Sequence, residues 1–266
     1  MIEQMKDLPE EIICLVADQD YEINEVGMSG SMVLMFENMV LKIQPETEET
    51  KSERMILKWL EGKLPAPRIL SDVNQEGKNY LLMSRVQGKM ACDEEYMSSP
   101  RVLVSVLAQS LKMLWKVDIA DCPVTWDLDA MLASAKERVE NGLVDMENTQ
   151  PETFGENGFE SPQELLGWLI ANRPVEELVL SHGDFCLPNI FIQDEKLSGY
   201  IDLGRAGIAD KWKDIAICYR SLKNNFDGKY SGKKYPDFNP DMLFSELGIE
   251  PDWEKINYYI LLDELF

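Results

Sequence analysis

The chain's fold and chemistry follow most directly from residues 182–204, which read His182-Gly-Asp-Phe-Cys-Leu-Pro-Asn189 and then, after a gap, Tyr200-Ile-Asp-Leu-Gly204. This stretch holds two carboxylates and one carboxamide, Asp184, Asn189 and Asp202, each flanked by apolar residues. Phosphoryl transfer from a nucleotide needs one acid to orient the acceptor hydroxyl, and an amide and a second acid to hold metal ions against the phosphates. The order therefore predicts phosphoryl transfer, with Asp184 as the catalytic acid and Asn189 and Asp202 as metal ligands.

Each of these residues also has a simpler explanation when it is taken alone. Asp184 can cap a turn after glycine, Asn189 can be a turn residue after proline, and Asp202 can end a strand. It is their occurrence together, in this order, that favours the catalytic interpretation. His182 is the only histidine in the chain. One histidine makes neither a relay nor a metal site, so we predict that it supports the loop backbone.

A second candidate group lies near the N-terminus. Lys42 is a lone cation in the apolar run Val40-Leu-Lys-Ile43, where it either extends to solvent or is kept for a phosphate and an ion pair. Glu53 on the following helix is the predicted partner, and Glu46, Glu48 and Glu49 are alternatives.

A glycine-bearing loop precedes this lysine by about a dozen residues. It reads Gly27-Met-Ser-Gly30, and it is either an ordinary hairpin or a loop whose backbone and Ser29 hydroxyl donate to phosphates. The sequence has no Gly-x-x-x-x-Gly-Lys-Ser/Thr run, which disfavours a P-loop enzyme.

Composition limits the classes of partner. The 266 residues carry 48 acids against 26 lysines and arginines, a formal net charge of −22. Such a chain is expected to repel nucleic acid and anionic membranes and to attract cations, although a surface biased toward solubility gives the same total. No apolar run approaches the roughly 20 residues of a membrane span, and residues 1–7 do not resemble a secretory signal. The five cysteines are scattered without a Cys-x-x-Cys pair, which favours reduced thiols in the cytoplasm.

Periodicity divides the chain into two parts. Before residue 87, after a helical segment at 10–17, we predict one helix at 50–60 and strands at 21–26, 32–36, 39–43, 68–73 and 80–86. After Gln87-Gly88 the pattern turns helical, at 101–117, 128–141, 161–171, 211–223 and 252–266, with an exposed acidic loop at 145–160. The pattern predicts an α+β protein with a small sheet lobe, 1–86, and a larger mainly helical lobe, 87–266.

Lys42, Glu53, the run from His182 to Asn189, and Ile201-Asp202 together resemble the aminoglycoside phosphotransferase family, relatives of eukaryotic protein kinases. The similarity is greatest to the 3′-phosphotransferases that inactivate kanamycin and neomycin. It continues through Gly204-Arg-Ala-Gly-Ile-Ala-Asp210-Lys-Trp-Lys-Asp214-Ile-Ala216 and the ending Trp253-Glu-Lys-Ile-Asn-Tyr-Tyr-Ile-Leu-Leu-Asp-Glu-Leu-Phe266. Gly183 stands where protein kinases carry arginine, which points to the branch acting on small molecules. The resemblance implies a two-lobed protein-kinase-like fold.

It also implies a set of site residues. ATP is expected between the lobes, with its adenine on the backbone of Ser84 and Val86, its phosphates on Ser29 and Lys42, Glu53 paired with Lys42, and Mg²⁺ on Asn189 and Asp202. The aminoglycoside is expected to contact Asp184, Arg205, Asp263, Glu264 and the terminal carboxylate of Phe266, together with the 145–160 loop.

The leading hypothesis is therefore ATP-dependent phosphorylation of an aminoglycoside at its 3′-hydroxyl, conferring resistance. One alternative is a kinase for another alcohol, such as choline, homoserine or a sugar. Another is a homologue that binds nucleotide or drug without catalysis. The expected partner is a polycationic small molecule, with neither nucleic acid nor membrane involved, and the expected state is a monomer or weak homodimer.

Overall fold

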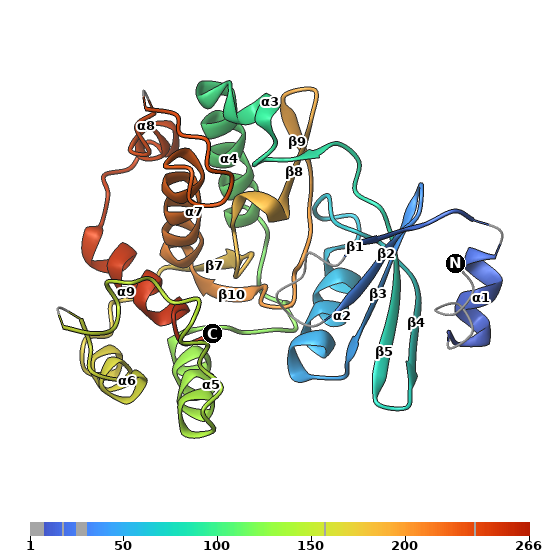
Figure 1. The fold of residues 1–266 in the computed structure, drawn as a ribbon, viewed down its shortest axis with the longest axis horizontal. Helices are drawn as coiled ribbons and strands as arrows, with labels where there is room; N and C mark the ends of the chain where they lie inside the picture. Colours follow the sequence, from blue (N-terminus) through green and yellow to red (C-terminus); the bar gives the residue numbers. More distant parts are fainter. Residues whose placement is uncertain (1–7, 18, 25–30, 157, 237) are drawn as a thin grey trace.

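The computed structural model describes residues 8–17, 19–24, 31–156, 158–236 and 238–266. It is an α+β protein with a sheet-based N-terminal part and a mainly helical C-terminal part lying side by side (Figure 1). The predicted fold class is therefore confirmed. Among the described residues, no helix is both long enough and apolar enough to cross a bilayer.

The N-terminal part is built on a five-stranded antiparallel sheet with the order β1-β2-β3-β5-β4. Its strands are β1 (Glu22–Asn24), β2 (Met32–Met35), β3 (Met39–Pro45), β4 (Ile69–Gln75) and β5 (Lys78–Ser84). The central strand β3 lies between β2 and β5, so that Lys42 is opposite Val33 on one side and Leu81 on the other. A cation is thereby fixed at the middle of the sheet.

Two helices accompany this sheet. Helix α1 (Glu10–Val16) contacts β4, and its Ile12 and Val16 pack with Leu34 and Leu41 in a small cluster of their own. Helix α2 (Glu48–Leu60) begins at a capping box, in which Thr47 accepts from the Thr50 amide while the Thr50 hydroxyl accepts from the Thr47 amide. This cap sets where α2 starts, and so sets which of its glutamates points toward the sheet.

The C-terminal part consists of helices packed around short strand pairs. The helices are α3 (Glu94–Met97), α4 (Pro100–Trp115), α5 (Leu128–Glu140), α6 (Pro162–Ala171), η1 (Leu187–Asn189), α7 (Lys211–Phe226), α8 (Met242–Leu247) and α9 (Trp253–Asp263). The strands are β6 (Lys89–Met90), β7 (Leu178–Ser181), β8 (Ile190–Gln193), β9 (Lys196–Tyr200) and β10 (Gly207–Asp210). β7 pairs with β10, and β8 lies between β6 and β9. The predicted catalytic stretch runs from the end of β7, through η1, to the loop after β9.

One hydrophobic core crosses the predicted boundary at 86/87. Ile56 and Leu60 of α2 and Leu81 of β5 belong to the same buried cluster as Leu107 of α4 and Ile190 of β8. The boundary falls in the segment between β5 and β6, but burial is continuous across it. The division into two domains thus stays a prediction, and the packing favours two lobes that share a core.

Candidate active site

A buried carboxylate anchors the catalytic loop. Asp214, in the first turn of α7, accepts hydrogen bonds from the Ser181 hydroxyl at 2.9 Å and from the amides of His182 and Gly183 at 2.7 and 2.9 Å. Its carboxylate is fully buried, and burial raises its pKa above the ordinary value even though His182 and Lys213 favour its charge. Three donors on one buried acceptor fix the backbone immediately before Asp184.

Gly183 is required by this arrangement for two reasons. Its φ is +85°, in the left-handed region. A Cβ built on it would lie 1.9 Å from the main-chain oxygen of Arg205. The glycine that the sequence shows in place of a kinase arginine therefore lets the loops carrying Asp184 and Arg205 touch.

His182 supports the loop, as predicted. It is fully buried, its Nδ1 accepts from the Asp184 amide at 3.3 Å, and its ring packs edge-on against Phe185 and Tyr200. Burial lowers its pKa. A neutral imidazole that accepts from the backbone fits a structural role.

The structure brings Asp184 and Asn189 together. Asn189 is in η1, and its Nδ2 donates to Asp184 Oδ2 at 2.9 Å and to the Asp184 main-chain oxygen at 3.1 Å. Burial, followed by the nearby Asp263 carboxylate, raises the pKa of Asp184, while Arg205 opposes that rise. Asp184 is thus a desolvated carboxyl group held in one orientation.

Asp202, the third residue of the catalytic motif, forms an ion pair with Lys42 of strand β3. Lys42 Nζ lies 2.9 Å from Asp202 Oδ1 and 3.1 Å from Glu53 Oε2, which confirms Glu53 as its partner on α2. Burial alone would lower the pKa of Lys42, but the two carboxylates outweigh it and raise that pKa. Desolvation by the surrounding protein opposes the charge on Asp202 although part of its side chain reaches solvent, and the adjacent Lys42 ammonium nevertheless holds its pKa below the ordinary value.

The alternative partners for Lys42 are engaged elsewhere. Glu46 pairs with Arg54 at 2.7 Å, Glu48 with Lys51 at 2.7 Å, and Glu49 with Arg205 at 3.4 Å. Glu53 is the one whose carboxylate is buried against the sheet. Which glutamate faces Lys42 depends on the residue at which α2 begins, and the sequence predicts that residue only approximately.

The predicted Mg²⁺ ligands fit that ion. The Ile201 amide donates to the Asn189 main-chain oxygen at 3.0 Å, so the segments carrying Asn189 and Asp202 run side by side. The Asp202 side chain is 53% exposed. One amide oxygen and one carboxylate are few protein ligands, as is usual for Mg²⁺ when phosphates and water complete its coordination shell. Among the described residues there is no group of three or more histidine, cysteine or acidic side chains placed to hold a metal by themselves.

The two residues predicted for the adenine, Ser84 and Val86, lie at the end of β5 and in the segment that connects it to β6. Ser84 ends β5, and its amide is committed to the Arg68 carbonyl at 2.9 Å. Val86 follows in the connecting segment and lies against Gly199 of β9. Ser29, with the rest of the Gly27–Gly30 loop, lies outside the described residues, so its predicted phosphate contact stays a prediction.

Next to Asp184 lies a cavity of about 480 Å³ lined by Gly183, Arg205, Asp263 and Phe266, along with residues of α5 and the start of α2. Arg205 lies 3.4 Å from Glu49 and 3.9 Å from Asp263, and its guanidinium faces the Phe266 ring at 5.4 Å. Both lobes therefore contribute walls. Three of the predicted drug-binding residues, Arg205, Asp263 and Phe266, line this one cavity.

Glu264 is placed differently. Its side chain is buried, and it accepts from the Gln150 amide at 2.7 Å, from Gln150 Nε2 at 3.1 Å and from Arg220 at 3.3 Å. Arg220 also pairs with Asp263. In this arrangement Glu264 ties the 145–160 loop to the chain end and does not line the cavity, so a direct contact with substrate stays a prediction.

Two residues of the site were not predicted. Asp214 and Lys213 both come from the first turn of α7, and Lys213 lines the cavity. Their segment belongs to the stretch that resembles the family, but no role was predicted for either residue, because a helical aspartate and lysine are ordinary surface residues until the fold buries them.

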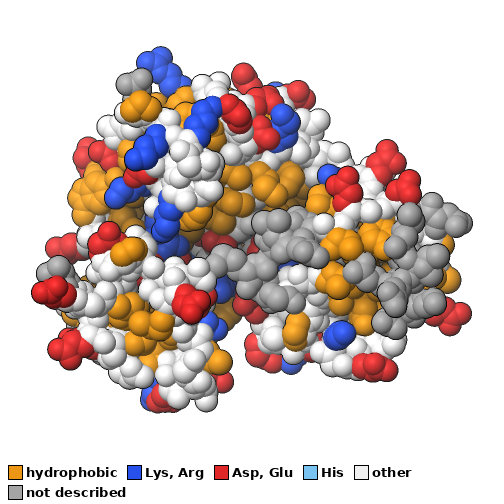
Figure 2. All heavy atoms as spheres, viewed as in Figure 1, with side chains coloured by type: hydrophobic (Ala, Val, Ile, Leu, Met, Phe, Trp, Pro, Cys, Tyr) orange, Lys and Arg blue, Asp and Glu red, His pale blue; other side chains and the backbone are white. Residues whose placement is uncertain are grey.

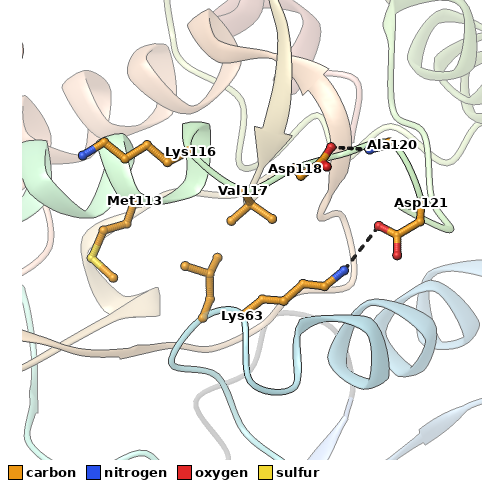
Figure 3. Close-up of a pocket in the computed structure, with 8 residues that line it drawn as sticks. Lys63, Met113, Lys116, Val117, Asp118, Ala120 and Asp121 are labelled. Carbon is orange, nitrogen blue, oxygen red and sulfur yellow. Dashed lines mark hydrogen bonds and ion pairs between the residues drawn. The ribbon is translucent and has the colours of Figure 1, made fainter.

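A second hollow, of about 610 Å³, lies between the end of α2 and the segment after α4 (Figure 3). Lys63 reaches across it to Asp121 at 3.3 Å, while Lys116 points away. Its lining contains none of the predicted site residues. The chemistry thus concentrates in the cavity beside Asp184.

Comparisons with known proteins agree with this geometry. Residues 20–242 match the model of the phosphotransferase enzyme family. An aminoglycoside 3′-phosphotransferase from Enterococcus faecalis is 42% identical, covering 90% of this chain and 91% of that protein, and one from Staphylococcus aureus is 41% identical over the same shares.

Solved structures show the same fold. An aminoglycoside phosphotransferase, APH(3″)-Id, from Streptomyces rimosus superposes with a TM-score of 0.80 at 26% identity, covering 96% of this chain and 95% of that one. An aminoglycoside 3′-phosphotransferase of type VIII gives 0.79 at 26% identity, covering 99% and 100%. With its catalytic loop, its Lys42–Glu53 pair and these relatives, the chain belongs to the aminoglycoside phosphotransferase family and is a phosphotransferase enzyme.

Proposed function

We propose that this enzyme transfers the γ-phosphoryl group of ATP to the 3′-hydroxyl of an aminoglycoside in the cytoplasm, and that it thereby confers resistance. The observation that carries the proposal is the position of Asp184, which directly follows Gly183, a residue that lines the same cavity as Asp263 and Arg205. The similar proteins from Enterococcus faecalis and Staphylococcus aureus are aminoglycoside 3′-phosphotransferases, which supports both the substrate class and the 3′ position. The complex of the Streptomyces rimosus protein with ADP and streptomycin supports the nucleotide.

The residues divide the reaction between the lobes. Lys42, held by Glu53, places a positive charge for the phosphates of ATP. Asn189 and Asp202 would hold Mg²⁺, which would neutralise phosphate charge when bound. Asp184 accepts a hydrogen bond from the acceptor hydroxyl and orients its oxygen. It takes the hydroxyl proton as the new bond to the γ-phosphorus forms and the bond from that phosphorus to the bridging oxygen breaks, with ADP as the leaving group. Its raised pKa makes it a better proton acceptor than an exposed aspartate.

The drug is proposed to be held by carboxylates at the cavity wall. Asp263 and Glu49 flank Arg205 there, and ammonium groups pair well with carboxylates in a partly desolvated cleft. Arg138 donates to the main-chain oxygens of Leu265 and Phe266 at 2.8 and 2.7 Å, which fixes the end of α9 against α5. These two bonds tie the residues that follow α9 to the cavity wall without any contribution from the drug.

The test is ATP turnover by the purified protein with Mg²⁺ and a panel of kanamycin, neomycin, choline and homoserine. A matched pair tests the position: kanamycin B should be phosphorylated, whereas its 3′-deoxy counterpart, tobramycin, should not. NMR of the product should show the phosphate on the 3′-oxygen. Turnover with choline or homoserine alone would remove the proposed acceptor, and ATP binding without any turnover would favour a non-catalytic homologue.

Glu264 gives a separate prediction. Replacing it with alanine is expected to raise KM for the aminoglycoside at least about fivefold and to leave KM for ATP within twofold, because Gln150 and Arg220 lose the acceptor that positions the loop and Asp263. Steady-state kinetics with each substrate varied in turn measures both. Equal rises for the two substrates would show that this contact serves only the fold.

A further inference from the structure

Lys213 is a buried cation that faces the drug cavity. It occupies the third position of α7, its residue is 8% exposed, and it lines the cavity with Gly183 and Asp263. Within the described part of the chain, its ammonium makes neither a hydrogen bond nor an ion pair. Most buried lysines are paired, so one left free at a cavity wall calls for a reason.

Stability does not supply that reason. The first turn of a helix carries the positive end of its dipole, which disfavours a cation there. Burial lowers the pKa of Lys213, and Arg205 lowers it further, against the opposing effects of Asp214, Asp263 and Asp184. The neighbouring Lys211, by contrast, pairs with Glu177 at 2.5 Å. Neither the helix dipole nor an ion pair therefore stabilises a lysine at position 213.

A second donor on the same cavity also has no acceptor. The indole Nε1 of Trp126 is buried, has no hydrogen-bond partner among the described residues, and belongs to a side chain that lines the cavity with Lys213. Buried donors without acceptors are uncommon in folded proteins. The Trp126 Nε1 has no accessible surface, so the Lys213 ammonium is the unpaired donor at this part of the wall, while the part around Asp263 presents acceptors.

We propose that Lys213 selects among aminoglycosides, by donating to a hydroxyl or ring oxygen of the bound drug and by opposing an ammonium group at that point. The proposal rests on the proposed function, since it assumes that the drug occupies this cavity. The physical reason is that two like charges in a partly desolvated pocket repel far more strongly than in water. A hydroxyl in the same place satisfies the ammonium of Lys213.

Two pairs of drugs isolate this difference, and all four carry the 3′-hydroxyl. Neomycin and paromomycin differ by an ammonium against a hydroxyl at the 6′ carbon, and kanamycin B and kanamycin A differ in the same way at the 2′ carbon. The measurement is the Kd of each drug by calorimetry, without nucleotide, for the wild type, Lys213→Met and Lys213→Gln. Binding is measured apart from turnover, so the two proposals are tested separately.

In at least one pair, the preference of the wild type for the hydroxyl member is expected to fall at least about tenfold in both variants. Lys213→Arg should keep the preference, and Lys211→Met, on the same turn but paired with Glu177, should leave it unchanged. Ratios within twofold of wild type in both pairs would overturn the proposal. An equal loss of affinity for both members would overturn it too, since that assigns Lys213 to the fold. If the drugs bind with these ratios but are not phosphorylated, only the proposed function fails; if none binds, both fail.

Discussion

Replacing Asp184 with asparagine is expected to lower kcat for aminoglycoside phosphorylation by at least about 10²-fold. The variant keeps the size of the side chain, and its amide oxygen can still accept from Asn189 Nδ2, now at 2.9 Å from Asp184 Oδ2. It cannot take the proton of the acceptor hydroxyl. The loss should therefore fall on the chemical step, with KM for ATP within about threefold of wild type.

The measurement is kcat and KM for both substrates, with unfolding monitored on the same samples. Asp194→Asn is the matched control, because Asp194 lies in the exposed turn between β8 and β9 with a φ of +49°, a conformation that asparagine tolerates. It should retain wild-type turnover. A kcat within threefold of wild type for the Asp184 variant would show that another group receives the proton.

Gly183→Ala is expected to destabilise the protein by at least about 3 kcal/mol, or to prevent its folding. The new methyl group would lie 1.9 Å from the Arg205 main-chain oxygen, and the backbone would keep an unfavourable φ of +85°. The clash can be relieved only by separating the loops of Asp184 and Arg205. Residual folded protein should therefore be inactive as well.

The control variant Gly62→Ala distinguishes the cost of backbone strain from the cost of a steric clash. Gly62 has a φ of +76°, close to that of Gly183, but nothing lies within 4 Å of its added Cβ. It should cost about 1 kcal/mol, the penalty of the left-handed backbone alone. Urea midpoints and slopes for the two variants measure the difference. Similar losses in both would mean that the loops can move apart without penalty.

The fold was largely predictable from periodicity. The strand at 32–36 and the helices at 128–141 and 161–171 begin and end within one residue of the observed β2, α5 and α6, and the strand at 39–43 begins with β3, which ends two residues later. The helix predicted at 252–266 ends earlier, at Asp263, where the chain turns to bring Glu264 toward Gln150. The short elements α3, α8 and β10 were not predicted. A stretch of four to six residues carries too little pattern, and tertiary packing decides its conformation.

The site was predictable where residue order reflects chemistry. Asp184, Asn189 and Asp202 were found from their order, and Glu53 from its place on the next helix. Asp214 and Lys213 were not found, because their roles depend on burial that only the packing of α7 against β7 creates. Glu264 was assigned to substrate from the resemblance, and the contact it makes with Gln150 depends on how the loop folds back.

Two carboxylates that line the cavity already have arginine partners: Asp263 has Arg205 and Arg220 beside it, and Glu49 has Arg205. The excess of acid, a net charge of −22, is instead spread over the surface, and the face in Figure 2 shows acidic side chains scattered across both lobes. We therefore expect the rate at which the drug binds and the rate at which it dissociates to depend on different charges of the protein. The surface field speeds the arrival of a polycation and weakens with added salt. The time that the drug then stays is set by the cavity, where local pairing leaves little for salt to screen.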